Sequence, residues 1–152
     1  DDEITHVTLY MQLQNMRYNH CADFIADIPP ELGSLTIPKL TFQPIVENAL
    51  LHGILMKEEK KGCILLTGWR EGEDAVLVIS DDGAGIAPEK LDTLLDSLSA
   101  DNGLTSLRHI GVSNTNLRLK SLYGDAYGLS FTSTPGQGTE VTVRIPARPV
   151  SL

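Results

Sequence analysis

The feature that most constrains this chain is an apolar run that stops abruptly at two aspartates and two glycines. Residues 75–79 are all apolar, and residues 81–85 are Asp-Asp-Gly-Ala-Gly. A continuous apolar run of this length is typical of a buried strand, which predicts that the Asp81 carboxylate lies at a strand end. Gly83 and Gly85 allow the backbone to turn sharply and to approach a flat ligand with no Cβ in the way. A carboxylate beside bare backbone suits an exocyclic amino group such as N6 of adenine. The alternative is an ordinary Asp-Gly turn.

Other glycine-based sites do not fit this spacing. The dinucleotide fingerprint needs a glycine at position 88, where the chain has Pro88, and no G-x-x-x-x-G-K-[ST] phosphate loop occurs. A calcium loop in the only possible register would place Val78 and Ser80 at ligand positions. The glycines therefore indicate either a plain turn or an adenine site.

Composition narrows the class of partner. A single domain of 152 residues with a net charge of −8 argues against nucleic acid as a ligand, because a phosphate backbone needs a basic surface. An acidic domain can still bind ATP when a divalent cation balances the charge. We expect no membrane span and no signal peptide in this sequence. Cys21 and Cys63 lack metal-site spacing and are predicted to be reduced thiols of a cytosolic domain.

Periodicity and turn residues predict an α+β fold. Helices are expected at about 1–19, 38–53, 88–98 and 113–123, with a mobile polar loop at 99–108. Strands are expected at about 23–28, 63–70, 75–80, 129–134 and 139–145. The predicted architecture is a two-layer sandwich in which helices cover one face of a mostly antiparallel sheet.

The first predicted helix carries two apolar rows. One row is Ile4, Val7 and Met11, and the other is Leu9, Leu13 and Met16. Two interpretations remain open: the helix packs on its own domain, or it is the end of a dimerising helical hairpin.

Four short motifs occur in a characteristic order. They are Glu47-Asn48-Ala49, Asp81-x-Gly83-x-Gly85, His109-Ile110-Gly111-Val112-Ser113-Asn114 and Gly136-Gln137-Gly138-Thr139. This ordered set resembles the ATP-binding domain of sensor histidine kinases, within the wider group that includes gyrase, mismatch-repair and chaperone ATPases. Residues 10–18 and 37–53 are similar to the branch of membrane-bound sensors related to cell-wall and carbohydrate responses. The resemblance extends over nearly the whole chain.

The resemblance implies roles for three residues of the second predicted helix. Asn48 would bind Mg²⁺, and its amide oxygen is a suitable hard ligand for that ion. Glu47 would be the catalytic residue whose carboxylate polarises the attacking nucleophile, unless it is merely a solvated helix residue. His52 lies one turn after Asn48 on the same helix face, where it could contact a phosphate or be a half-buried structural histidine.

One departure from the gyrase-like pattern bears on the reaction. Those ATPases place their catalytic glutamate four residues before the asparagine, and this chain has Pro44 there. The sequence therefore favours phosphoryl transfer over ATP hydrolysis.

The remaining nucleotide-binding residues are also assigned by resemblance. Those near the adenine are Asp81, Gly83, Gly85, Ile86 and Thr139, with the Thr139 hydroxyl beside the Asp81 carboxylate. Those near the phosphates are His109, Gly111, Val112 and Asn114, at a helix start whose N–H groups suit an anion. The family usually has Gly-x-Gly where this chain has His109-Ile110-Gly111. Either His109 or Arg108 replaces the missing contact, or the lid over the phosphates is weaker. Arg118 and Lys120 are expected to be solvated.

The resemblance implies a catalytic domain that transfers the γ-phosphoryl group of Mg·ATP to a histidine upstream of this sequence. None of His6, His20, His52 and His109 lies in the Pro-His-Phe context that this branch uses. Residues 1–19 would be the end of an upstream dimerisation and phosphoacceptor helix, and residues 20–152 the ATP-binding domain.

The implied partners are a response regulator and a second copy of the protein, joined through upstream helices. The implied location is the cytoplasmic side of a bacterial inner membrane, with membrane contact only through upstream segments. A non-catalytic nucleotide-binding module and a gyrase-like ATPase are the alternatives.

Overall fold

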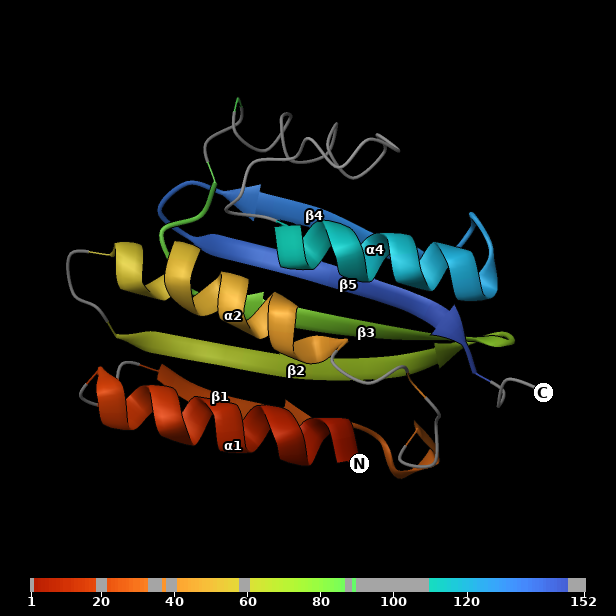
Figure 1. Cartoon of the computed structure of the whole chain (residues 1–152), viewed down its shortest axis with the longest axis horizontal. Coiled ribbons are helices and arrows are strands. Elements are labelled where there is room, and N and C mark those ends of the chain that lie inside the picture. Colours follow the sequence, from red (N-terminus) through yellow and green to blue (C-terminus); the bar gives the residue numbers. More distant parts are fainter. Residues whose placement is uncertain are drawn as a thin grey trace.

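Five strands form one sheet, and the helices lie across one of its faces (Figure 1). The computed structural model describes residues 2–18, 22–32, 37, 41–57, 61–86, 89 and 110–147. The strands in this part of the chain are β1 (Ala22–Asp27), β2 (Gly62–Glu71), β3 (Asp74–Asp81), β4 (Gly128–Thr134) and β5 (Gly138–Pro146). The helices are α1 (Asp2–Arg17), α2 (Phe42–His52) and α4 (Ile110–Tyr123), with short 3-10 turns η1 (Pro30–Leu32) and η2 (Ile54–Met56).

The strand order is β1-β2-β3-β5-β4. Only β1 and β2 run parallel, and the other neighbours are antiparallel. The sheet is thus mostly antiparallel with helices on one face, which confirms the predicted fold class. Residues 75–79 are all buried at the centre of the sheet, as the continuous apolar run predicts.

Helix α2 begins at Phe42, later than the predicted start near Pro38. This start places Pro44 in the first turn, where the missing N–H of proline has no intrahelical partner to lose. Ile45, Val46 and Leu50 are fully buried against the sheet. The face of α2 that bears these residues therefore forms the centre of the core.

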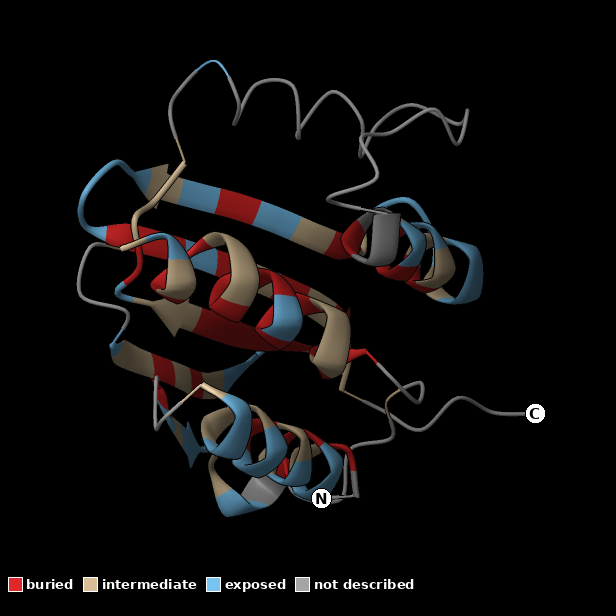
Figure 2. Cartoon of the chain, turned by 60° about the vertical axis from the view of Figure 1, so that its left-hand side comes forward, coloured by how far each residue is buried: buried red, intermediate tan, exposed pale blue. Residues whose placement is uncertain are grey.

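Helix α1 packs on its own domain through one of its two apolar rows. Val7 and Met11 are buried, whereas Leu9, Leu13 and Met16 are 55%, 64% and 78% exposed. Figure 2 shows both buried and exposed positions along the helices that cover the sheet. At the end of the helix, the Asn15 side chain bonds both backbone groups of Ala22, at 2.7 and 3.0 Å. The pair of bonds fastens α1 to the start of β1.

Helix α4 begins at Ile110, so the predicted start at Ser113 is wrong by three residues. Val112, Thr115 and Leu119 are buried at helical spacing. Their packing against the sheet stabilises a helix that begins before Ser113. Gly111 consequently lies inside the first turn of α4, and not ahead of the helix.

Several predictions fall outside the described residues, namely most of the helix at 88–98, the loop at 99–108, His109 and Cys21. Cys63 is a free thiol. None of the helices in the described part of the chain has the length and apolarity that a membrane span requires.

Candidate functional site

The predicted adenine residues gather where β3, α2 and β5 end or begin. Asp81 is the last residue of β3 and pairs with Thr139 at the start of β5. Gly53 directly follows α2 and lies against the turn after β3. Segments from three distant parts of the sequence therefore meet around one carboxylate.

The Asp81 carboxylate is held in a fixed orientation and is largely removed from water. Its Oδ1 accepts a hydrogen bond of 2.8 Å from the Gly83 N–H, and the Thr139 backbone donates a second bond. Burial raises the pKa of Asp81 to about 6, although these two backbone bonds act in the opposite direction. A desolvated, oriented carboxylate is a strong acceptor for a ligand N–H group.

Two glycines, Gly53 and Gly83, place bare backbone directly against the Asp81 carboxylate. A Cβ on Gly83 would lie 2.3 Å from the Gly53 carbonyl carbon and 2.7 Å from Asp81 Oδ1. A Cβ on Gly53 would lie 2.8 Å from the same oxygen. The Ala84 N–H donates to the Gly53 carbonyl at 3.0 Å, which ties the turn to the end of α2. From the sequence, Gly53 is predicted only as the end of a helix, because its contact with Gly83 is tertiary.

The glycine turn is also fastened to the β4–β5 hairpin. Gly85 adopts a φ of 75°, and the Gly136 N–H donates to the Ala84 carbonyl at 2.7 Å. The Ile86 N–H donates to Ser133 Oγ at 2.7 Å, and Ser133 Oγ lies 2.8 Å from Thr139 Oγ1.

Ser133 therefore joins Ile86 to Thr139, although sequence reasoning did not include it. The only indication of this role in the sequence is the position of Ser133 opposite Thr139 in the predicted hairpin.

The two adjacent aspartates have different surroundings. Asp82 is exposed, and its Oδ1 accepts a hydrogen bond of 2.8 Å from the Cys63 N–H at the start of β2. Asp82 thus holds the edge of the β2–β3 pair, whereas the Asp81 carboxylate lies against Gly53 and Gly83.

Helix α2 supplies the residues predicted for metal and phosphate contacts. Asn48 is buried, Glu47 is exposed and His52 is half-buried one turn after Asn48. The helix packs on β3 and also contacts α4. The amide oxygen of Asn48 fits the hard-ligand chemistry of Mg²⁺, which typically takes one or two protein oxygens beside water and phosphate.

Helix α4 contributes mainly backbone to this region. Gly111 lies in its first turn, where N–H groups have no intrahelical partner. Val112 is 2% exposed within the core, so a ligand could meet only its backbone, and Asn114 is exposed. Asn116 accepts a bond of 2.8 Å from the Leu129 N–H and holds α4 to β4, a structural role that the sequence did not indicate. Lys120 donates to the Asp125 carbonyl at 2.9 Å.

Taken together, these groups can bind a flat amine-bearing base beside Asp81, a hard cation at Asn48 and an anion near the first turn of α4. Gly53 and Gly83 allow the two backbones to approach each other beside Asp81, since a Cβ on either would collide with backbone or with the carboxylate itself. The arrangement fits a magnesium-bound adenine nucleotide.

Comparison with known proteins agrees with this chemistry. Residues 36–149 match the model of the family described as histidine kinase-, DNA gyrase B- and HSP90-like ATPases. The chain is 31% identical over 147 residues to the sensor histidine kinase BtsS of Escherichia coli K12, covering 97% of this chain and 23% of BtsS. It is 35% identical over 152 residues to the sensor protein LytS of Streptococcus mutans, covering 96% of this chain and 24% of LytS. The chain thus spans about a quarter of the length of these relatives.

Solved structures show the same fold. The catalytic domain of histidine kinase ThkA, free of nucleotide, aligns with a TM-score of 0.69 at 13% identity, covering 97% of this chain and 93% of that one. The mycobacterial sensor histidine kinase MprB aligns with a TM-score of 0.61 at 18% identity, covering 97% and 96%.

Proposed function

Because this chain belongs to the family of histidine kinase-, DNA gyrase B- and HSP90-like ATPases, we propose that it is the ATP-binding catalytic domain of a sensor histidine kinase. It transfers the γ-phosphoryl group of ATP to a histidine that lies outside this sequence. The observation that carries the proposal is the Asp81 carboxylate, largely removed from water and oriented beside the bare backbone of Gly53 and Gly83.

Asp81 recognises adenine by accepting a hydrogen bond from its N6 amine. The two backbone donors of Gly83 and Thr139 hold the carboxylate before the nucleotide arrives, so little ordering is needed on binding. Thr139 and Ser133 stand beside Asp81, and their linked hydroxyls can accept or donate a bond to the base or to a bridging water. Gly85 and Ile86 complete this side of the site.

Helix α2 and the first turn of α4 serve the triphosphate end. Asn48 would hold Mg²⁺, which when bound neutralises part of the phosphate charge. His52 and the backbone N–H groups near Gly111 contact phosphate oxygens, with Asn114 at the same helix start. Glu47 orients and polarises the acceptor imidazole. His109, outside the described residues, would supply a further phosphate contact.

Phosphoryl transfer is favoured over hydrolysis. Pro44 occupies the helix position where gyrase-like ATPases carry their catalytic glutamate, so no carboxylate there activates water. Catalysis then depends on positioning the acceptor and on neutralising charge, the two effects that dominate phosphoryl transfer.

Residues 1–19 are the end of a helix that continues into a dimerisation and phosphoacceptor segment. The exposed row of Leu9, Leu13 and Met16 on α1 supports this assignment, because an apolar row suits a partner helix. In the same assignment the whole protein is a homodimer held in a bacterial inner membrane by upstream segments, and this domain lies on the cytoplasmic side. Its phosphoryl group passes to a response regulator. The similarity to BtsS, a sensor histidine kinase, and to LytS, a sensor protein, supports this role.

Radiolabel transfer tests the proposal. The 152-residue chain should bind ATP yet take no label from [γ-³²P]ATP, because the acceptor is absent. The same domain joined to its upstream segment should acquire an acid-labile, alkali-stable label. Label on the 152-residue chain itself would contradict the assignment of the acceptor, and binding without label in either form would favour a non-catalytic nucleotide module.

A further inference from the structure

Three polar side chains form a row across the end of the sheet. Asp81 on β3, Thr139 on β5 and Ser133 on β4 lie opposite one another in the strand register. Directly opposed residues of neighbouring strands point to the same face of a sheet. The residues two positions away on each strand belong to the hydrophobic core, namely Ile79, Val141 and Phe131. The row therefore lies on the helix-covered face, with one hydroxyl next to the Asp81 carboxylate and a second beyond it.

The Ser133 hydroxyl has three polar neighbours. The Ile86 N–H donates to its oxygen at 2.7 Å. The Gly138 carbonyl oxygen lies 3.0 Å away, and Thr139 Oγ1 lies 2.8 Å away. A hydroxyl has one proton to donate and two lone pairs that can accept. Ser133 therefore bonds all three neighbours only if it donates once and accepts twice.

The Gly138 carbonyl decides which neighbour receives the Ser133 proton, because a carbonyl oxygen can only accept. If Ser133 donated to Thr139 instead, a lone pair of its oxygen would face the carbonyl oxygen at 3.0 Å with no hydrogen between them. Ser133 thus donates to Gly138 and accepts from Ile86 and Thr139. The Thr139 hydroxyl gives its single proton to Ser133, so its oxygen has only lone pairs left for a ligand.

We propose that Ser133 is a positioning residue that makes Thr139 a hydrogen-bond acceptor and thereby selects a 6-aminopurine over a 6-oxopurine. The inference rests on the proposed binding of ATP and adds a second determinant of base specificity beside Asp81. The ionised carboxylate only accepts, and Thr139 next to it then does the same. A 6-amino group brings two hydrogens to this pair of acceptors, whereas a 6-oxo group would bring further lone pairs. Thr139 is 6% exposed, so water can do little to compensate such a mismatch.

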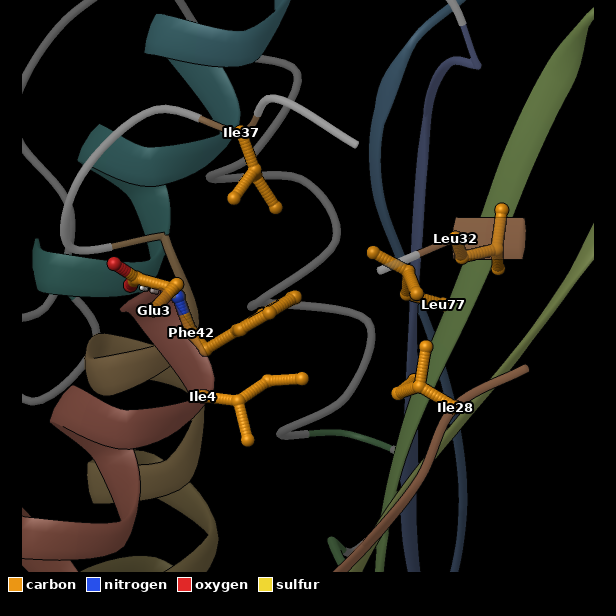
Figure 3. Close-up of a pocket in the computed structure, with 7 residues that line it drawn as sticks. All are labelled: Glu3, Ile4, Ile28, Leu32, Ile37, Phe42 and Leu77. Carbon is orange, nitrogen blue, oxygen red and sulfur yellow. Dashed lines mark hydrogen bonds between the residues drawn. The ribbon is translucent and has the colours of Figure 1, made fainter. Parts of the chain in front are cut away.

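A cavity elsewhere in the domain provides a control for where the base binds. It lies beneath the first turn of α1, at the opposite end of α2 from Gly53, and apolar side chains face each other across it (Figure 3). Among the described residues that line it, Glu3 alone is charged, and its Oε1 accepts a bond of 3.1 Å from the Phe42 N–H. This lining lacks the paired acceptors of the row, so nucleotide should not perturb the Ile28 and Leu77 methyl groups that border the cavity.

The test measures the affinity of this 152-residue chain for ADP and for inosine diphosphate, which differ only in the 6-substituent of the purine. The wild type should prefer ADP by at least about 100-fold. In Ser133→Ala the freed Thr139 hydroxyl can turn and donate to the 6-oxo group, so this preference should fall about tenfold, the order of one hydrogen bond. Ser133→Thr keeps a hydroxyl and should retain the preference. Ser130→Ala is the matched control, because this exposed serine of β4 points to the other face of the sheet.

A double-mutant cycle separates the orientation of Thr139 from general damage to the site. Damage alone would weaken both nucleotides to the same degree and leave their ratio unchanged. Thr139→Val keeps the shape of the side chain and removes the hydroxyl, so it should lower the preference about as much as Ser133→Ala does. Adding Ser133→Ala to Thr139→Val should lower it no further, because Ser133 acts on the base only through Thr139. In methyl NMR spectra, ADP should shift the Ile86 resonances and leave those of Ile28 and Leu77 in place.

An unchanged ratio in Ser133→Ala, or a further fall in the double mutant, would overturn the role of Ser133 and leave ATP binding standing. Equal affinity of the wild type for the two diphosphates would overturn the selection of the 6-amino group. Shifts at Ile28 and Leu77 in place of Ile86, or no binding of either nucleotide, would refute the proposed site and this inference with it.

Discussion

The substitution Asp81→Asn should weaken adenine binding and at the same time stabilise the nucleotide-free domain. Asparagine keeps the shape of the side chain, and its Oδ1 can still accept the bond from the Gly83 N–H. Its amide nitrogen, however, presents a donor where the carboxylate presented an acceptor. Losing one charge-assisted bond and opposing two donors should cost about 2–4 kcal/mol of binding free energy, or roughly 30- to 1,000-fold in Kd.

The gain in stability follows from the raised pKa of Asp81. The ordinary value of 3.8 rises to about 6 in the folded chain, mainly through burial. The folded state thus holds this proton more tightly than the unfolded state does. Stability from this group is greatest below about pH 4, falls as the pH rises to about 6, and is constant above that. Ionisation of Asp81 therefore lowers the stability of the folded chain by about 3 kcal/mol at neutral pH. Asparagine, which stays neutral, does not cause this loss.

Two measurements check this reasoning. Urea unfolding from about pH 4 to pH 8 should show wild-type stability falling relative to Asp81→Asn, with the change complete near pH 6. Adenosine is the better ligand for the affinity measurement, because the phosphates of ATP titrate in the same range. Its affinity for the wild type should fall below about pH 6 as Asp81 protonates, whereas the variant should bind weakly at every pH.

Unchanged adenosine affinity in Asp81→Asn would refute the assignment of Asp81 to adenine. Parallel stability curves for the two proteins would show instead that the carboxylate is well solvated. Asp82→Asn is the matched control, because that residue is exposed and bonds the Cys63 N–H at the start of β2.

Three further outcomes are expected. Asn48→Ala should abolish the tightening of ATP binding by Mg²⁺ and leave adenosine affinity intact in calorimetry, and a surviving Mg²⁺ effect would place the ligand elsewhere. Gly83→Ala should destabilise the domain by about 1–3 kcal/mol and prevent adenine binding, since its Cβ would lie 2.3 Å from the Gly53 carbonyl carbon; retained binding would contradict the close approach of the two backbones. Arg144→Ala removes contacts of 3.0 Å to Asp74 at the far end of the sheet. It should lower unfolding stability by no more than about 1 kcal/mol, because the guanidinium is partly exposed, with nucleotide affinity unchanged.

Much of the architecture follows from local pattern. The apolar run at 75–79 predicts the central strand, and the buried strand confirms it. Successive side chains of a strand point to opposite faces, so a continuous apolar run leaves neither face suited to water. The two apolar rows of α1 are also real, but periodicity could not tell which row packs. The structure buries Val7 and Met11 and leaves Leu13 exposed, since only one row can face the sheet.

Chemical roles within the site depended on contacts between distant segments. Asp81 and Asp82 are adjacent and identical, yet one is desolvated beside Gly53 while the other bonds the Cys63 N–H. Ser133 was missed because a single serine in a strand is unremarkable until its partner across the hairpin is known. The start of α4 was misjudged because the packing of Val112 on the sheet outweighs the preference of Ser113 for a helix start. A sequence encodes, residue by residue, which faces avoid water, whereas hydrogen-bond partners and close backbone approaches exist only once separate segments have packed together.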